Sequence, residues 1–172
     1  MEIDLQPVGE IEHDILLQLR GRLNKVFGCP VTVTNQITIP GEAFNPDRKQ
    51  YLSDIFVDIL KTRKKVDAYL LGITNVDLYT EGLNFVFGQA DVVSGVSVIS
   101  LYLLRQENYG LPADRDLLIE RAQKEAVHEL GHNLGMGHCS DGICVMHFSN
   151  SLIDTDIKKP QFCSHCQPKL AL

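Results

Sequence analysis

The sequence lacks an excess of basic residues, and this excludes one broad class of function. Its 16 lysines and arginines are outnumbered by 22 aspartates and glutamates, which gives a formal net charge of −6. A nucleic-acid-binding surface needs a basic patch, so we expect no nucleic acid among the partners. The one basic run, KTRKK at residues 61–65, follows an apolar helical pattern and is interpreted as a solvated helix end.

Long apolar runs are also lacking, because no stretch approaches the ~20 apolar residues that a membrane-spanning helix needs. The first twelve residues, MEIDLQPVGEIE, are acidic and lack the basic-then-apolar order of a secretory signal. If residue 1 is the true start, we expect a cytoplasmic protein that meets no membrane. Thiols stay reduced in that compartment, so the five cysteines favour metal ligands or buried thiols over disulfides.

No repeat, low-complexity tract or long Pro/Gly/Ser linker divides the 172 residues, so we expect one domain over residues 1–172. Hydrophobic spacing predicts strands at residues 2–8, 31–33, 68–73, 84–90 and 92–104, and helices at 10–27, 52–60 and 116–135. The order implies parallel strands with helical crossovers, and no helix fits between the last two strands. The predicted fold class is therefore α/β (α+β): a mixed sheet with one antiparallel edge strand and a loop-like region after residue 135.

The segment HELGHNLGMGH, residues 128–138, places three histidines and a glutamate within eleven residues. His128 and His132 are four positions apart and therefore share one helix face. Gly135 suits a turn that ends the helix, and such a turn would bring His138 back to the same point. Three neutral nitrogen ligands with one open position are typical of a catalytic zinc.

Glu129 is the predicted general base in this arrangement. Zinc lowers the pKa of its bound water to roughly 7, and Glu129 would accept the water proton and pass it to the departing amine. The competing interpretation is a surface helix with solvated histidines. The offsets of Gly135 and His138, and the methionine Met146 that follows them, disfavour that interpretation.

Four of the five cysteines form two close pairs in the last third of the chain. Cys139 and Cys144 give CxxxxC, and Cys163 and Cys166 give CxxC, which predicts a closed, structural four-thiolate zinc site. Free thiols, a redox role of the CxxC, and His165 as a replacement ligand are the alternatives. The tail after residue 138 has few apolar residues, so metal binding would supply its stability. Cys29 is interpreted as a buried apolar side chain.

The pattern H-E-x-x-H-x-x-G-x-x-H with a following methionine is that of the metzincins. With CxxxxC, Met146 and CxxC added, the sequence resembles the archaemetzincins over residues 127–166, and FNPDRKQY and LNFVFGQA also look like that family. The resemblance implies a compact minimal metzincin domain with a twisted mixed sheet and two zinc ions. It also implies a methionine turn at Met146 beneath the catalytic zinc. Residues 85–89 would then be an edge strand that an extended peptide could join, or an ordinary edge strand.

One position departs from the wider pattern. Some metzincins carry a tyrosine two residues after the turn methionine, and this sequence has Phe148 there. Support for the oxyanion would then come from the zinc alone, from His147 or from a backbone amide, although His147 is more simply a packed or surface residue.

The sequence thus predicts a zinc-dependent peptidase that acts as a monomer on peptides or unfolded proteins. A low-turnover, zinc-stabilised peptide-binding protein is the alternative, which the retention of Glu129 disfavours because metal binding does not need that carboxylate. A redox protein is the third possibility. Endopeptidase and aminopeptidase action stay open, since the positions of the acidic residues Asp91 and Glu107 cannot be deduced from the sequence.

Overall fold

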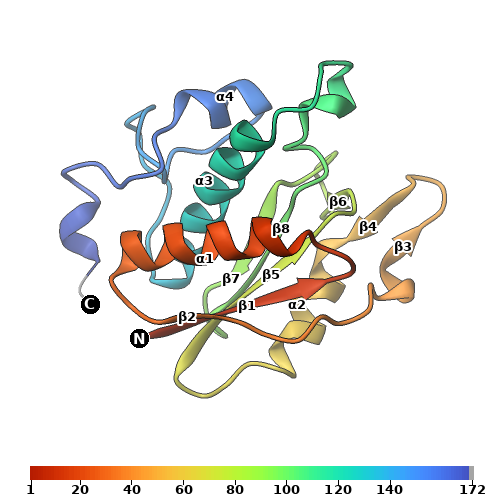
Figure 1. Ribbon diagram of the computed structural model, residues 1–172, viewed down its shortest axis with the longest axis horizontal. Helices are drawn as coiled ribbons and strands as arrows, with labels where there is room; N and C mark the ends of the chain where they lie inside the picture. The colour runs from red at the N-terminus through yellow and green to blue at the C-terminus, as the bar shows by residue number, and fades with distance from the viewer. Residues whose placement is uncertain (171–172) are drawn as a thin grey trace.

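The computed structural model describes residues 1–170, which form a twisted five-stranded sheet covered by helices on both faces (Figure 1). The strand order is β2-β1-β5-β8-β7. The bounds are β2 Val31–Val33, β1 Glu2–Val8, β5 Ala68–Thr74, β8 Val96–Ser100 and β7 Gly88–Asp91. All neighbouring pairs are parallel except β7 with β8, which is antiparallel at the sheet edge. The predicted mixed sheet with one antiparallel edge strand is confirmed.

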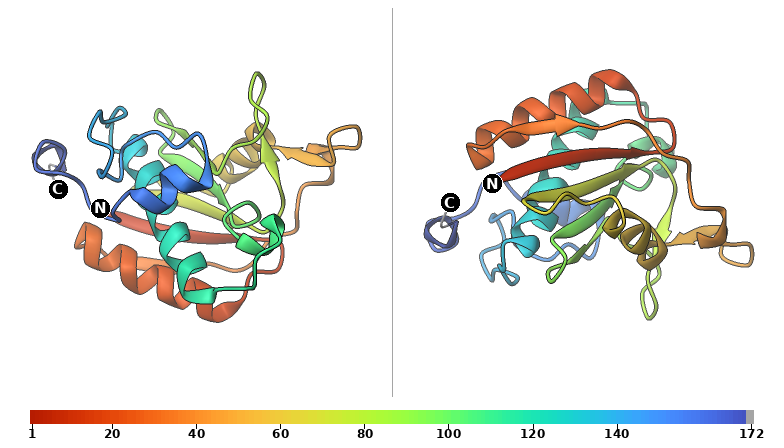
Figure 2. Two further views of the ribbon diagram at one scale, coloured as in Figure 1. Left: turned by 90° about the horizontal axis from the view of Figure 1, so that it is seen from above. Right: turned by 90° about the horizontal axis from the view of Figure 1, so that it is seen from below.

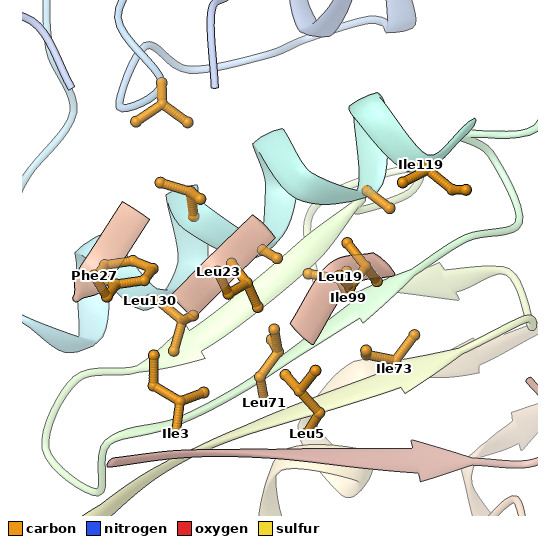
Figure 3. Packing of buried hydrophobic residues seen from close by; sticks show 14 of the residues in the cluster. Ile3, Leu5, Leu19, Leu23, Phe27, Leu71, Ile73, Ile99, Ile119 and Leu130 are labelled. Carbon is orange, nitrogen blue, oxygen red and sulfur yellow. The ribbon is translucent and has the colours of Figure 1, made fainter. Parts of the chain in front are cut away.

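Helices α1 (His13–Phe27) and α3 (Arg115–Asn133) cover one face of the sheet, and α2 (Ser53–Lys61) covers the other (Figure 2). Alternation along each strand divides the core between the faces, because successive side chains point to opposite sides. In β5, Leu71 packs toward α1 and α3 (Figure 3), and Leu70 packs toward α2. The hydrophobic layer under α3 therefore fixes the height of this helix above the sheet.

Both long helices have identifiable ends. Helix α1 stops at Gly28, which has a left-handed φ of 63° and donates its N–H to the carbonyl of Asn24. Helix α3 begins after Asp114, whose carboxylate accepts the N–H of Leu117. Each cap satisfies backbone groups that a helix end would leave unpaired.

The predicted strand at residues 84–90 is wrong in its first half. Only Gly88–Asp91 pairs with β8, while Val86 makes an isolated bridge to Leu78. The predicted strand at 92–104 is too long at both ends. Residues 92–95 turn the β7–β8 hairpin, with Gly95 at φ 69°, and residues 101–104 turn away after β8 ends at Ser100. Apolar composition continued through both turns, so periodicity alone placed no boundary there.

A second, three-stranded sheet was not predicted. It has the order β3-β4-β6, with β3 Phe44–Asn45, β4 Gln50–Leu52 and β6 Leu78–Tyr79. Each strand is too short to show a two-residue period, so its pairing depends on tertiary contacts. The FNPDRKQY stretch forms the β3–β4 hairpin of this sheet.

The region after residue 135 was expected to be loop-like, yet it contains helix α4 (Leu152–Ile157). Ser151 and Asp154 form a capping box at its start, a pattern that the sequence analysis overlooked. Three short 3₁₀ helices complete the elements: η1 Gly41–Ala43, η2 Gln106–Tyr109 and η3 Gln167–Lys169. Within residues 1–170, no helix combines the length and apolar composition that a membrane span requires.

Candidate active site and metal centres

The three histidines of the HELGHNLGMGH segment converge on one point. His128 and His132 lie one turn apart on α3, with their Nε2 atoms 3.0 Å apart. Helix α3 ends at Asn133, and Gly135 takes a φ of 83° that a Cβ would disfavour. The chain then doubles back, so that one ring nitrogen from each of His128, His132 and His138 lies within 4.8 Å of the other two.

Backbone carbonyls orient the two helical histidines. The Nδ1 of His128 lies 2.8 Å from the carbonyl oxygen of Val145, and the Nδ1 of His132 lies 2.8 Å from that of Met136. A carbonyl can only accept, so each Nδ1 carries the proton and each Nε2 keeps its lone pair. Burial lowers the pKa of His128 to about 3, with a further contribution from the Lys158 ammonium, so the ring is neutral at pH 7. These neutral nitrogen donors fit a zinc ion.

Glu129 lies beside this cluster on α3 and is 5% exposed. Burial raises the pKa of its carboxyl well above the ordinary value, and the neighbouring Glu125 carboxylate adds to the shift. A carboxyl group whose proton affinity has been raised in this way suits a residue that accepts and returns a proton.

Met146 is fully buried. Its sulfur packs on Gly131 of α3, where a Cβ would overlap the Sδ atom. The carbonyl oxygen of Met146 also accepts the N–H of Cys139, at 2.9 Å. The turn at Met146 therefore ties the base of α3 to the segment that carries His138.

The four cysteines of the two predicted pairs form a second cluster. One sulfur from each of Cys139, Cys144, Cys163 and Cys166 lies within 4.8 Å of the other three, and no disulfide joins them. The N–H of Cys163 points at the Sγ of Cys144, at 3.4 Å. Backbone N–H groups lower the pKa of Cys163 to about 7, whereas burial raises that of Cys166 to about 12. Four convergent sulfurs match the donor set of a closed tetrahedral zinc site.

A pocket of about 250 Å³ opens beside the histidine cluster. Phe85, Val86 and Phe87 form one wall, and Phe148, Ser149 and Asn150 form another. Three residues of α3 also line it, namely Glu125, His128 and Glu129. The pocket therefore joins the candidate chemical groups to the free edge of the sheet.

Comparison with known proteins bears on this geometry. The sequence pattern described as peptidase family M54 matches residues 14–171. The chain belongs to peptidase family M54. An archaemetzincin of Methanocaldococcus jannaschii is 45% identical over 170 residues, which cover 99% of this chain and 93% of that protein.

Two solved structures extend the comparison. A zinc-dependent peptidase from Methanocorpusculum labreanum superposes with a TM-score of 0.90 at 30% identity, covering 98% of this chain and 99% of the other. The archaemetzincin of Archaeoglobus fulgidus gives a TM-score of 0.86 at 37% identity, with the same coverage. The expected resemblance to archaemetzincins is thereby confirmed, together with the fold and the peptidase class.

The structure also places the other residues that the sequence analysis considered in this M54 peptidase, and it confirms that Cys29 is buried. The Nδ1 of His147 lies 2.9 Å from the carbonyl oxygen of Cys139, so this ring is held by the backbone. Phe148 packs on the ring of His138, with centroids 5.0 Å apart. Asp91 forms an ion pair with Lys61 at 2.6 Å, and Cys29 is a buried free thiol.

Sequence reasoning missed a group of buried charges on α3 next to the site. Arg121 and Glu125 lie on the same helix face as His128, and both are at most 4% exposed. Glu125 pairs with Lys158, and Arg121 pairs with Asp156 of α4. The spacing of polar residues at 121, 125 and 128 in an otherwise buried helix was the available signal.

Proposed function

We propose that His128, His132 and His138 hold the catalytic zinc ion of this M54 peptidase, and that Glu129 is its general base and acid. The observation that carries this proposal is the convergence of three histidine nitrogens within 4.8 Å, with a buried glutamate adjacent in the same pocket. A zinc ion with three protein ligands and one open position supplies a nucleophilic water at neutral pH and polarises the scissile carbonyl.

The protein's own side chains perform the proton transfers. Glu129 faces the pocket, accepts a proton from the attacking water and returns it to the departing amine. Val145 and Met136 hold the two helical histidines in the tautomer that keeps Nε2 free. Burial lowers the pKa of His128 and so keeps the ring unprotonated at neutral pH. Protonation would remove the lone pair that a metal ion needs.

Cys139, Cys144, Cys163 and Cys166 are proposed to hold a second, structural zinc ion. Four thiolates complete a tetrahedral shell, so no position is left for substrate. Because Cys139 follows His138 directly in the chain, order at the cysteine cluster also stabilises the position of His138. Both ligand sets and the pocket come from one chain, which supports action as a single domain and a single copy.

The substrate is a peptide or an unfolded protein segment. Among residues 1–170, strand β7 is the last strand of its sheet and pairs only with β8, so its outer edge can accept an extended peptide. The adjoining residues Phe85–Phe87 line the pocket together with Glu129. A peptide laid along this edge would present one side chain to the pocket and one carbonyl to the histidine cluster.

The test uses purified wild type, Glu129→Ala and a matched control, Asp116→Asn, which removes an exposed charge from the same helix. Each protein is incubated with a diverse synthetic peptide mixture, products are identified by mass spectrometry, and zinc is measured by atomic emission. We expect cleavage by wild type and Asp116→Asn, none by Glu129→Ala, and two zinc ions per chain in all three. Cleavage that persists in Glu129→Ala would disprove the assigned base. Absence of cleavage in zinc-loaded wild type would favour a peptide-binding protein.

A further inference from the structure

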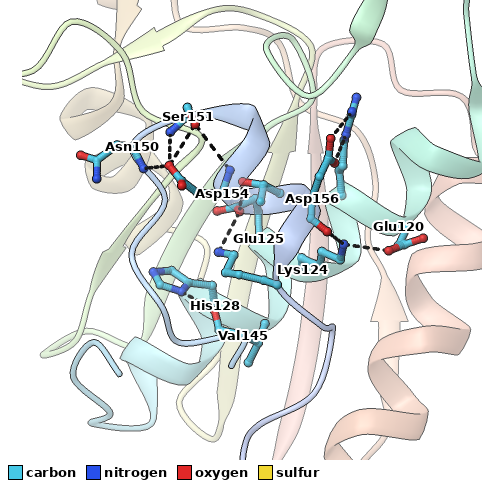
Figure 4. Close-up of polar contacts among 12 residues, drawn as sticks. Glu120, Lys124, Glu125, His128, Val145, Asn150, Ser151, Asp154 and Asp156 are labelled. Carbon is cyan, nitrogen blue, oxygen red and sulfur yellow. Dashed lines mark hydrogen bonds and ion pairs between the residues drawn. The ribbon is translucent and has the colours of Figure 1, made fainter. Parts of the chain in front are cut away.

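A buried ion pair lies one helical turn before the first histidine (Figure 4). Glu125 of α3 is 3% exposed, and its Oε1 accepts hydrogen bonds from the Oγ1 of Thr155, at 3.1 Å, and the Nζ of Lys158, at 3.2 Å. Thr155 belongs to α4, and Lys158 directly follows that helix. One oxygen of this carboxylate is therefore fully used inside the protein.

The second carboxylate oxygen of Glu125, Oε2, has a different environment. It has no hydrogen-bond partner among residues 1–170, and it is not among their enclosed, unpartnered atoms. Glu125 also lines the pocket beside His128 and Glu129. We take Oε2 as the part of the carboxylate that a group in the pocket can reach.

Lys158 does not offset the negative charge that the Glu125 carboxylate presents to the pocket. Its side chain is 0% exposed and does not line the pocket, so the ammonium lies behind the Glu125 carboxylate. Among the described residues that line the pocket, two are glutamates and none is a lysine or arginine. A group that enters therefore meets acceptors and negative charge before it meets the buried ammonium.

The rest of the pocket suits a long side chain with a donor at its end. Phe85, Val86 and Phe87 offer apolar surface to an alkyl stem. Ser149 and Asn150 add polar residues to the lining. At about 250 Å³ the pocket is smaller than the ~300–1,000 Å³ typical of drug-sized ligand sites, so it holds one side chain and not a larger ligand.

Glu125 is not the main residue that holds α4 against α3, because other contacts join these two helices. Arg121 forms a two-pronged ion pair with Asp156, at 2.6 and 2.7 Å, and Lys124 donates to the carbonyl oxygen of Asp156, at 3.2 Å. Burying a further charged pair is costly unless it is well compensated. Glu125 keeps a carboxylate next to the candidate catalytic group despite that cost.

We propose that Glu125 determines specificity: it binds the cationic side chain, arginine or lysine, of a substrate residue next to the scissile bond. This inference rests on the proposed function, because that function places the scissile bond beside Glu129. A substrate's free N-terminal ammonium carries the same chemistry, so the experiment must separate it from a side chain.

The test measures kcat/KM on one peptide scaffold with arginine, lysine, glutamine, norleucine or glutamate at each position next to the cut. Every peptide is made with a free and with an acetylated N-terminus. Wild type should cleave the arginine and lysine peptides roughly 10- to 100-fold faster than the glutamine and norleucine peptides. Acetylation should leave this preference unchanged. A preference that disappears on acetylation, or no preference for cations at all, would overturn the proposal.

Two variants assign the preference to Glu125. Glu125→Gln keeps an oxygen for Thr155 and Lys158 and should reduce the ratio of kcat/KM between the arginine and norleucine peptides to near one, whatever its effect on the rate that all peptides share. The double variant Glu125→Gln/Lys158→Gln leaves no unpaired charge at the site of this ion pair, so it covers the case in which the single variant fails to fold. Asp116→Asn, which changes the net charge equally outside the pocket, should keep the wild-type profile. An equal loss on all peptides in the folded Glu125 variants would show a purely structural role.

Binding measurements separate this inference from the proposed catalytic role. In a Glu129→Gln background, fluorescence anisotropy reports the affinity of labelled, acetylated peptides without turnover. The arginine peptide should bind at least about tenfold more tightly than the glutamine peptide, and adding Glu125→Gln should abolish the difference. If wild type cleaves none of the peptides but this difference is present, the proposed hydrolysis fails and the recognition stands. Equal affinities would refute the recognition whatever the activity.

Discussion

Gly88 of β7 lies so close to the side chain of Glu129 that only a glycine fits at position 88. A Cβ at position 88 would lie 2.7 Å from both Cγ and Oε1 of Glu129, and 2.9 Å from its Cδ. The edge strand thus sets the position of the proposed general base from the side opposite to α3.

Gly88→Ala should therefore displace the Glu129 carboxylate. Because small misplacements of a catalytic group are costly, we expect kcat to fall by about 100-fold while zinc content stays at the wild-type level. Overpacking should also lower the free energy of unfolding by about 1–3 kcal/mol. Steady-state kinetics, zinc analysis and urea unfolding measure the three quantities.

A double-mutant cycle shows whether the effect acts through Glu129. In a Glu129→Ala background the clashing atoms are absent, so Gly88→Ala should cost little stability. The same loss of stability in both backgrounds would mean that the alanine disturbs something other than Glu129.

Gly131→Ala should destabilise the protein although it lies within a helix. Alanine gains about 1 kcal/mol in helix propensity over glycine, but its Cβ would overlap the sulfur of Met146 and lie 3.3 Å from Phe162 Cε1. Overpacking costs about 1–3 kcal/mol and should prevail, with a lower melting temperature. Gly137→Ala is the matched control, because nothing lies within 4 Å of a Cβ there. Equal melting temperatures for the two variants would contradict the assigned contact.

The ion pair between Arg121 and Asp156 should respond unequally to removal of its two members. Arg121 is 5% exposed in its side chain and Asp156 38%. Asp156→Ala leaves a buried guanidinium whose only remaining partner within residues 1–170 is the carbonyl oxygen of Leu104, so we expect a loss of about 3–5 kcal/mol. Arg121→Met leaves a carboxylate that water can reach and should cost less. Urea unfolding compares them, and the reverse order would refute this reasoning.

Stability of the metal-free protein should depend on the protonation of His128. Its folded-state pKa is lowered to about 3 from the ordinary 6.5. Between these pH values the unfolded chain binds a proton that the folded chain does not, so the free energy of unfolding falls as pH decreases from 6.5 toward 3. One such group gives a slope of at most about 1.4 kcal/mol per pH unit. His128→Gln should have a flatter profile in chelator, and parallel profiles would show that another group dominates.

Loss of the zinc ion proposed at the four cysteines should lower the stability of the fold, and activity should fall as a consequence. We expect Cys144→Ser to bind one zinc ion instead of two and to melt at a lower temperature, because the segment from 136 to 170 has little apolar core of its own. His132→Asn should also bind one zinc ion but remain close to wild-type stability, while losing cleavage. Zinc analysis with thermal unfolding separates the two, and equal melting temperatures would argue against a structural site.

Local patterns predicted much of the scaffold. Apolar residues at helical or strand spacing identified β1, α1, α2, β5 and α3, and Gly28 marked the end of α1. The spacings of the histidines and cysteines alone predict two metal-ligand sets. These features are short-range, since each depends on residues a few positions apart along one element or turn.

Contacts between residues far apart in the sequence could not be predicted from short-range patterns. Glu125 and Lys158 are 33 positions apart, and Gly88 and Glu129 are 41 apart, so neither pair leaves a periodic trace. Strands of two or three residues, such as β3 and β6, form only because a partner lies beside them. Local spacing in the sequence was enough to identify the groups that are proposed to bind metal and to move a proton. The distances between those groups, the charges buried beside them and the residues that line the substrate pocket all follow from the packing of distant segments around α3. They could not be predicted locally, because they arise from contacts between parts of the chain that share no local pattern.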